Sequence, residues 1–347
     1  MEYSRESVFV SAIRTLCKAF AGVIGILIGI IVVFFVLMMF STHDVYPPKS
    51  TLTISPDANG NREFLPSSAP VILKLDIDGV IGIGDLTHKK VQSSLLDSRE
   101  GLLAPHRVKA LLLYIDSPGG SADDADDIYR AILSYKKKYQ IPVYAFVDGM
   151  CASGGMYIAC AADRIFATPT SVIGSVGVLL GPTFNFSGLM ERYGVQSLSL
   201  TQGKDKDMLN PFRPWVAGED QSLVKITSDL YNRFVDIVTE ARPRLTREKL
   251  VDELGAQVFS TQDAQQLGYI DVGDSDYDVA VDELAKAAQI PETEKYQVLT
   301  ITPTHTLLSD LSESHPSLLQ GKITHSFQMG SFTNSELSGR FLYLYQP

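Results

Sequence analysis

From residue 70 onward, the sequence alternates between short apolar runs and longer segments with helical spacing, and this alternation restricts the fold more than any other feature. Runs such as 110–116 and 143–147 are apolar at consecutive positions, which is typical of parallel strands covered on both faces of a sheet. The pattern predicts an α/β domain of βαβ units over residues 70–290. Strands are expected at 71–76, 110–116, 143–147, 164–167, 172–180 and 196–200, and helices at 89–97, 122–139, 155–162, 186–192, 219–241, 247–253, 264–267 and 279–288.

Residues 19–42 contain no charged side chain. At about 1.5 Å per residue, a helix of this length crosses a hydrocarbon core of about 30 Å. A cleaved signal peptide has an apolar region of about 7–15 residues and a small-x-small cleavage site, and residues 39–43 do not provide such a site. The segment is therefore predicted to be a retained transmembrane anchor.

Basic residues on the two sides of this anchor predict its orientation. Arg5, Arg14 and Lys18 precede it, whereas Lys49 is the basic residue that follows it closely. By the positive-inside rule, residues 1–18 are expected in the cytoplasm. We therefore predict a single-pass protein of the cell (inner) membrane whose catalytic domain lies on the extracytoplasmic side.

Composition excludes one class of partner and marks the segments that flank the domain. The chain has 347 residues, of which 45% are hydrophobic, and its net charge of −10 leaves no basic stripe for nucleic acid. Residues 43–69 are rich in Pro, Ser, Asn and Asp and are expected to form a linker. Residues 291–347 are rich in Ser, Thr and His, and the sequence predicts no role for this extension.

The three cysteines predict no disulfide. Cys17 lies at the cytoplasmic edge of the expected anchor, away from Cys151 and Cys160. The latter two are nine residues apart, which along a helix is about 13 Å, too far for an S–S bond. Both are expected to be small buried side chains. Cys151 is a weaker candidate nucleophile than Ser153, because no nearby histidine is available to form its thiolate.

The predicted helix 122–139 carries charges that suit its dipole. Ser121 is a candidate N-cap, acidic residues fill the first turns, and Lys136, Lys137 and Lys138 fill the last one. The acidic residues are Asp123, Asp124, Asp126 and Asp127. A divalent metal site is the alternative, but no histidine or calcium-loop pattern accompanies them. A solvated acidic cap is therefore predicted, and no metal.

Ser153 lies between small residues, directly after the apolar strand 143–147 and before a helix-like run. A hydroxyl at such a turn is accessible and meets the positive end of a helix dipole. No histidine occurs between His106 and His305. If Ser153 is a nucleophile, its base is expected to be a residue other than histidine.

Two glycine-containing turns, at 117–120 and 152–155, follow consecutive predicted strands. Glycine lets a substrate carbonyl approach the backbone, and two N–H groups aimed at one point form an oxyanion hole. The candidate donors are the N–H groups of Gly119 and Gly154. One such turn alone is more often structural, but two of them with a serine in the second favour catalysis.

A lysine can replace histidine as the base when burial lowers its pKa from about 10.4 toward neutrality. The segment 201–212 supplies two candidates, Lys204 and Lys206, just after a predicted strand. Lysines in loops are usually exposed, so the spacing alone does not select either of them.

Five motifs together resemble the signal peptide peptidase A family, which consists of membrane-anchored serine peptidases with a Ser–Lys dyad. The motifs are DSPGG at 116–120, GMCASGGMYIA at 149–159, AADRIFA at 161–167, IGSVGV at 173–178 and GKDKD at 203–207. They occur in the family's order over residues 70–290, and the length matches its short, single-domain form. Cys151 departs from the small, mostly non-thiol residues expected before the serine, and it is small enough to leave the nucleophile's assignment intact.

The resemblance implies Ser153 as nucleophile, Lys206 as general base and Ser175 as the hydroxyl that orients the lysine, with Gly119 and Gly154 at the oxyanion hole. Lys206 is chosen over Lys204 because the family's base follows the strand-ending glycine by three residues. The implied fold is the crotonase/Clp-protease type of α/β spiral. The implied assembly is a homo-oligomeric ring in which a neighbour's lysine can complete each site. The implied substrates are remnant signal peptides or other apolar peptides, and no cofactor is implied.

Two other functions compete with this expectation. A crotonase-type enzyme would use the same oxyanion geometry on acyl-CoA, but the expected extracytoplasmic location argues against it. An inactive scaffold or membrane-protein regulator would keep the fold without turnover. Every proposed catalytic position is filled, which disfavours that alternative.

Overall fold

The computed structural model describes residues 8–40, 50–104, 106–303 and 340–345. The chain divides into two compact units, Met1–Lys49 and Ser50–Pro347. In the first unit, the described residues form one helix, α1 (Val8–Phe40). Its stretch Ala12–Phe34 is long and apolar enough to cross a membrane, as an anchor or a signal sequence would. Of the anchor expected at 19–42, residues 41–42 lie outside the described part.

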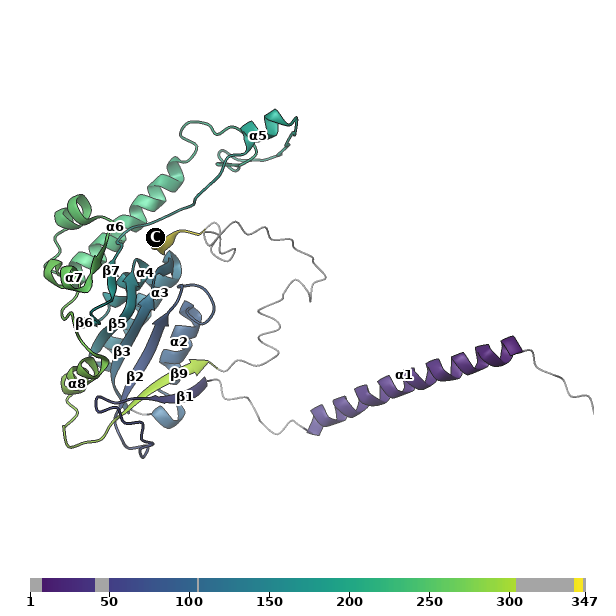
Figure 1. The fold of residues 1–347 in the computed structure, drawn as a ribbon, viewed down its shortest axis with the longest axis horizontal. Helices are drawn as coiled ribbons and strands as arrows, with labels where there is room; N and C mark the ends of the chain where they lie inside the picture. The colour runs from purple at the N-terminus through teal and green to yellow at the C-terminus, as the bar shows by residue number, and fades with distance from the viewer. Residues whose placement is uncertain (1–7, 41–49, 105, 304–339, 346–347) are drawn as a thin grey trace, which may run out of the picture. The chain divides into compact units, whose positions relative to one another are not determined.

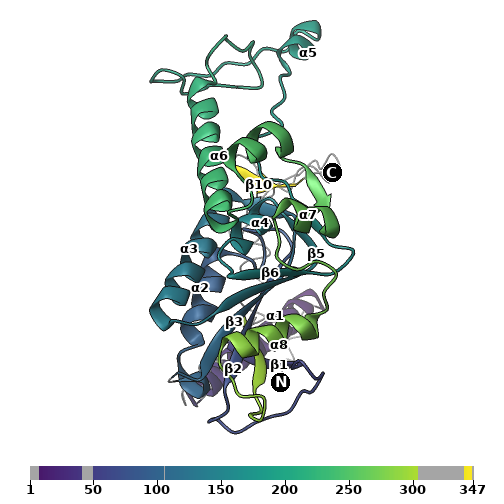
Figure 2. The same ribbon diagram turned by 90° about the vertical axis from the view of Figure 1, so that its left-hand side faces the viewer.

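The second unit contains a mixed sheet, a short two-stranded sheet and the helices that cover them (Figures 1 and 2). Its strands are β1 (Ser50–Ser55), β2 (Val71–Asp78), β3 (Val108–Ser117), β4 (Gly119–Ser121), β5 (Val143–Ala152), β6 (Arg164–Ala167), β7 (Val172–Gly174), β8 (Val258–Ser260), β9 (Gln297–Pro303) and β10 (Leu342–Leu344). Its helices are α2 (His88–Asp97), α3 (Ala122–Tyr139), α4 (Gly154–Ala159), α5 (Ser187–Arg192), α6 (Gln221–Ala241), α7 (Thr261–Leu267) and α8 (Tyr277–Ala287), with a 3₁₀ turn at Gly101–Leu103 and a π-helix at Lys249–Leu254.

The large sheet has eight strands in the order β1-β9-β2-β3-β5-β7-β8, with β6 also paired to β5. The pairs from β9 through β7 are parallel, as the continuous apolar runs predict, whereas β1 and β8 add antiparallel edges. Strands β1 and β9 lie outside the segment 70–290 and still belong to this sheet. Their sequences, STLTIS and QVLTITP, are too polar to stand out as buried strands.

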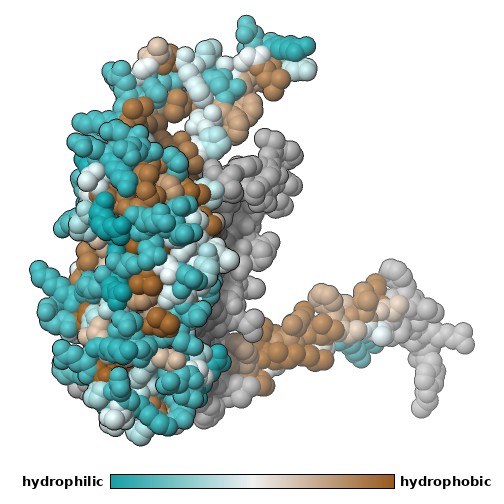
Figure 3. All heavy atoms as spheres, turned by 60° about the vertical axis from the view of Figure 1, so that its left-hand side comes forward, coloured by the Kyte–Doolittle hydropathy of each residue, from teal (hydrophilic) through white to brown (hydrophobic). Residues whose placement is uncertain are grey.

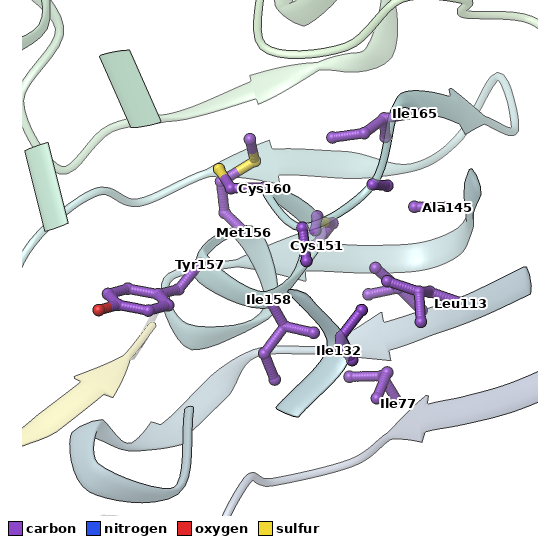
Figure 4. Packing of buried hydrophobic residues seen from close by; sticks show 14 of the residues in the cluster. Ile77, Leu113, Ile132, Ala145, Cys151, Met156, Tyr157, Ile158, Cys160 and Ile165 are labelled. Carbon is purple, nitrogen blue, oxygen red and sulfur yellow. The ribbon is translucent and has the colours of Figure 1, made fainter. Parts of the chain in front are cut away.

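Consecutive apolar residues of the central strands face opposite sides of the sheet. In β3, Leu111, Leu113 and Ile115 belong to the larger core under α3, α4 and α6, whereas Ala110 and Leu112 pack on the other face with α8. Figure 4 shows part of the larger core, with Leu113 beside Ile132 of α3 and with Cys151 and Met156 nearby. Both faces of this strand are covered, which fixes its position at the centre of the domain.

Helix α3 forms as its sequence predicts. The side chain of Ser121 accepts a hydrogen bond from the N–H of Asp124, Lys136–Lys138 lie in the last turn, and Ile128, Ile132 and Tyr135 face the core. The expected burial of Cys151 and Cys160 is also confirmed, because their exposed fractions are 0% and 5% and both thiols are free.

Residues 181–220 form a projecting arm that contains α5 at its far end (Figures 1 and 2). The strand expected at 196–200 is wrong, because the segment has no regular structure and no ladder partner. Its leucines, Leu198 and Leu200, are 84% and 88% exposed. The alternation of Ser and Leu gives the period of a strand, but a strand forms only where a neighbour satisfies its backbone.

Candidate active site

Ser153 sits at a sharp turn between β5 and α4, as its sequence context predicts. Its backbone has φ 54° and ψ −114°, a conformation that side-chain-bearing residues rarely adopt. The Ser153 N–H donates to the carbonyl of Gly174 (2.8 Å), and its own carbonyl accepts from the N–H of Tyr157 (3.0 Å). Neighbouring elements thus hold the turn on both sides, and strained backbone of this kind clusters at functional sites.

Ser175 lies beside Ser153 because of strand register. Ala152 of β5 pairs with Gly174 of β7 in parallel, so the residues that follow them leave the sheet together. Ser175 has φ 55°, and its N–H donates to the carbonyl of Gln257 (2.7 Å). Both serines are almost fully buried, with exposed fractions of 1% and 5%, so the exposure expected for the Ser153 hydroxyl is wrong within one chain.

The two glycine turns also meet, although they are far apart in sequence. The amide nitrogen of Gly154 is 2.7 Å from the position that a Cβ on Gly119 would occupy, and Gly119 has φ +97°. The Ser117 hydroxyl supports the first turn by donating to the Gly79 carbonyl (2.6 Å) and accepting from the Gly119 N–H (3.2 Å). The structure therefore brings Ser153, Ser175, Gly119 and Gly154 to one place.

The C-terminal strand β10 crosses this place. It pairs antiparallel with β4, with Leu344 opposite Gly119. On its other side, Leu342 exchanges two hydrogen bonds of 2.9 Å with Leu179. The carbonyl oxygen of Tyr343 lies 1.9 Å from the position of a Cβ on Gly119 and 3.0 Å from that of a Cβ on Gly154. The extended strand β10 therefore lies between β4 and Leu179, a space that we call the groove, with the Tyr343 carbonyl over the two glycines.

The side chain of Tyr343 is held in an aromatic pocket. Its ring stacks on Tyr157 at 5.0 Å between centroids and lies 4.8 Å from the ring of Phe234. Its hydroxyl donates to the carbonyl of Leu230 (3.0 Å). In Figure 4, Tyr157 points toward the yellow strand β10 and away from the labelled aliphatic side chains. The residue whose carbonyl lies over the glycines is thus also the most deeply enclosed residue of the strand.

Asp126 and Arg233 fix the orientation of Tyr157. The Tyr157 hydroxyl donates to Asp126 Oδ1 (2.6 Å), and Arg233 Nη2 contacts the same oxygen (2.6 Å). Burial tends to raise the pKa of Asp126, but the hydrogen bonds from Tyr157 and Arg233 outweigh it, so the pKa lies below its ordinary value. The carboxylate therefore stays ionised and holds one wall of the pocket in place.

Lys206 is not part of this cluster within one chain. It lies on the projecting arm with an exposed side chain, whereas Ser153 is 1% exposed. Among the residues that the structure describes, no hydrogen bond joins the two. Lys204 lies on the same arm and is 91% exposed. A lysine that acts on Ser153 must therefore come from a different arrangement of the arm or from another copy of the chain.

Cys151 is a poor alternative nucleophile. Burial raises the pKa of its thiol well above the ordinary range, and the neighbouring Cys160 adds to the effect. The thiolate that would react is therefore suppressed.

The sequence reasoning missed the residues that bind β10, chiefly Leu179, Tyr157 and Phe234. The run Phe341–Tyr345 has the apolar character of a strand, and this was the one signal available. Its partner strand β4 is only three residues long, GGS, and carries no strand pattern of its own.

The sequence matches the models of two known families. The Clp protease family model matches residues 69–174, and the model for peptidase family S49 matches residues 135–291. A solved structure of ClpP1 from Listeria monocytogenes has 18% identity and a TM-score of 0.39, and the match covers 59% of this chain and 92% of that one.

Among curated relatives, "Putative protease slr0021" from Synechocystis is 33% identical over 60% of this chain and 71% of its own length. "Putative signal peptide peptidase SppA" from Enterococcus faecium is 31% identical, with 64% of each chain covered. "Protease 4" from Salmonella typhi is 27% identical over 78% of this chain and 41% of its own. The matched segment is thus shorter than two thirds of the Enterococcus and Salmonella proteins.

The sheet, its covering helices and the serine turn define a Clp-protease-like α/β fold. The chain belongs to peptidase family S49, the signal peptide peptidase A family.

Proposed function

We propose that the chain is a membrane-anchored serine endopeptidase that cleaves apolar peptides, including remnant signal peptides, in extended form. One observation carries this proposal: a peptide strand lies in the groove with the Tyr343 carbonyl over Gly119 and Gly154, next to the strained turn of Ser153. A peptide bond bound in this register lies against the backbone of Gly119 and Gly154, which carry the proposed oxyanion donors, and beside the turn that carries the Ser153 hydroxyl. The names of the relatives agree with a peptidase.

In the proposed reaction, Ser153 Oγ attacks the carbonyl carbon and its proton passes to the amine of Lys206. The oxyanion is stabilised by the N–H groups of Gly119 and Gly154. Lys206 then gives the proton to the leaving amine, the peptide bond breaks, and an acyl ester remains on Ser153. Water attacks this ester and regenerates the serine. Ser175 orients the lysine, and the reaction uses no cofactor.

We place Lys206 of one copy at Ser153 of a neighbour in a ring. The arm that carries Lys206 exposes large apolar side chains, seen as brown patches at the top of Figure 3. They include Phe184, Leu189, Leu198, Leu200, Trp215 and Val216. Burial of this surface against a second copy would remove it from water. Removal from water favours the neutral amine of a lysine, which is the form that acts as a base.

The anchor completes the proposal. Residues 19–42 hold the chain in the cell membrane, and Arg5, Arg14 and Lys18 keep the N-terminus in the cytoplasm. The peptidase domain would then face apolar peptides on the extracytoplasmic side.

Hydrolysis by the full-length chain in detergent tests this function. We expect a synthetic apolar signal peptide to be cut internally, with new termini identified by mass spectrometry. A polar peptide of equal length, which lacks a side chain for the aromatic pocket of Tyr157 and Phe234, is expected to persist. Persistence of the signal peptide and of casein under these conditions would contradict the proposal.

Deletion of residues 340–347 tests whether β10 competes with substrate. The strand fills the groove, so its removal is expected to lower the apparent KM for added peptides by about 5-fold or more with little change in kcat. Steady-state hydrolysis measures both constants. A chain with Tyr345→Ala, which keeps the backbone pairing of β10, is the matched control. An unchanged KM after deletion would mean that β10 does not occupy the groove in solution.

A further inference from the structure

The side chain of Arg340, three residues before Tyr343, contacts a carboxylate of the domain. Its Nη1 lies 3.4 Å from Oδ2 of Asp124, at the start of α3. The Asp124 side chain is only 10% exposed, whereas that of Arg340 is 48% exposed. A nearly buried carboxylate thus meets the end of a long side chain that otherwise remains in solvent.

The protein holds Asp124 in position from other directions. The N–H and Nδ1 of His88 lie 3.1 and 2.8 Å from Oδ1, so Oδ2 is the oxygen that faces Arg340. Burial alone would raise the pKa of Asp124, but the hydrogen bonds from His88 and Ser121 outweigh it and keep the pKa below its ordinary value. The nearby Asp127 is 4.0 Å from His88 and is paired with Arg130. Asp124 is therefore a fixed anion beside Arg340.

Gly82 leaves the space that this contact needs. A Cβ at Gly82 would lie 2.9 Å from Asp124 Oδ2 and 3.5 Å from Arg340 Nη1. The backbone at Gly82 has φ +91°, which also favours glycine. The Arg340 side chain thus lies between the backbone of Gly82 and the fixed carboxylate of Asp124, and about half of it is exposed to solvent, which suits a long cationic side chain.

We propose that Asp124 is a specificity residue of the groove, which selects peptides with an Arg or Lys three residues before the residue whose carbonyl lies over Gly119 and Gly154. The proposal rests on the proposed function, because it takes β10 as a guide to how substrates bind. Any peptide in the same register places its own side chain at Asp124. A charge-assisted contact there fixes the register, so that the scissile bond and not its neighbour faces Ser153.

Peptide binding to the full-length Ser153→Ala chain in detergent tests the inference without turnover. The probes are fluorescent hexapeptides X-Phe-Leu-Tyr-Leu-Tyr in which X is Arg, Ala or Glu, and the Kd is measured by fluorescence anisotropy. The chain's own β10 competes equally with all three, so the ratios of Kd are free of its effect. We expect the Arg peptide to bind about 5-fold more tightly than the Ala peptide, which corresponds to the strongest exposed ion pairs. The Glu peptide is expected to bind more weakly than the Ala peptide.

Two variants locate the effect. Asp124→Asn keeps an acceptor for His88 and removes the charge, so the ratio between Arg and Ala is expected to fall to about one. Asp123→Asn removes a charge from the same helical turn at an exposed position, and the ratio is expected to stay near its original value. Higher salt is expected to reduce the preference in the parent chain only.

The outcomes separate this inference from the proposed function. Equal binding of the Arg, Ala and Glu peptides to the parent chain would overturn the inference, as would equal loss of the preference in both variants. Binding of the three peptides to the parent chain alone shows whether a preference for Arg exists, so this result does not depend on whether the Asp124→Asn variant folds. If the preference is present but the chain with Ser153 hydrolyses none of the peptides, the subsite stands and the peptidase proposal fails.

Discussion

Ser153→Ala is expected to lower kcat/KM for peptide hydrolysis by at least about 10⁴-fold, because the variant lacks the proposed nucleophile that forms the acyl ester, whereas Ser175 is assigned to orient the lysine. The burial of Cys151 suppresses the one neighbouring thiolate. Fluorogenic hydrolysis by the full-length variant in detergent measures the loss, and an unchanged melting temperature confirms that the fold is intact. Retention of even a tenth of the parent activity would exclude Ser153 as the nucleophile.

Replacement of the two arm lysines belongs to the same experiment. Lys206→Ala is expected to cause a comparable loss, whereas Lys204→Ala, its neighbour on the same exposed loop, is expected to retain most activity. The opposite result would identify Lys204 as the base. If the arm has only a structural role, both lysine variants are expected to lose activity to a similar and smaller extent.

Mixing inactive variants shows which chain supplies the base. If each site takes Ser153 from one copy and Lys206 from the next, equal mixing and reassembly of Ser153→Ala and Lys206→Ala is expected to restore about a quarter of the parent activity, since random neighbours complete about one site in four. If both residues come from one chain, no activity returns.

Gly119→Ala is expected to lower kcat/KM by about 10²-fold or more. Its Cβ would lie 1.9 Å from the Tyr343 carbonyl oxygen and 2.7 Å from the Gly154 nitrogen, so a bound peptide and the second oxyanion donor are both displaced. The positive φ adds strain of about 1–3 kcal/mol to the folded state. Peptide hydrolysis and thermal unfolding, measured on the same preparation, separate the two effects.

Gly60→Ala is the matched control for backbone strain. Gly60 has φ +77°, and a Cβ there would meet nothing within 4 Å. It is therefore expected to lose stability without losing hydrolysis per folded molecule. Equal catalytic losses in the two variants would mean that Gly119 contributes only to folding.

Much of the fold follows from local patterns. Strands β2, β3 and β6 and helix α3 were predicted closely, because continuous apolar runs and a capped amphipathic helix carry their own signals. The strand expected at 143–147 continues to Ala152, and the strand expected at 172–180 ends at Gly174. Strands β1 and β9 were not predicted, because they mix polar and apolar residues without a clear strand pattern. They also pair with each other across about 250 residues of sequence. The strand expected at 196–200 failed for the converse reason, because it has the period of a strand and no partner in the chain.

The sequence by itself determined the residue types of the site: a serine at a strand-to-helix turn, two glycine turns and a region without histidine. Only the tertiary structure determined which of these residues lie close together. Register between β5 and β7 placed Ser175 beside Ser153, and the packing of α4 against the end of β3 brought Gly154 to Gly119. It also laid residues 342–344 in the groove and left Lys206 on an exposed arm. Such proximity depends on long-range pairing and packing, which local residue patterns do not encode.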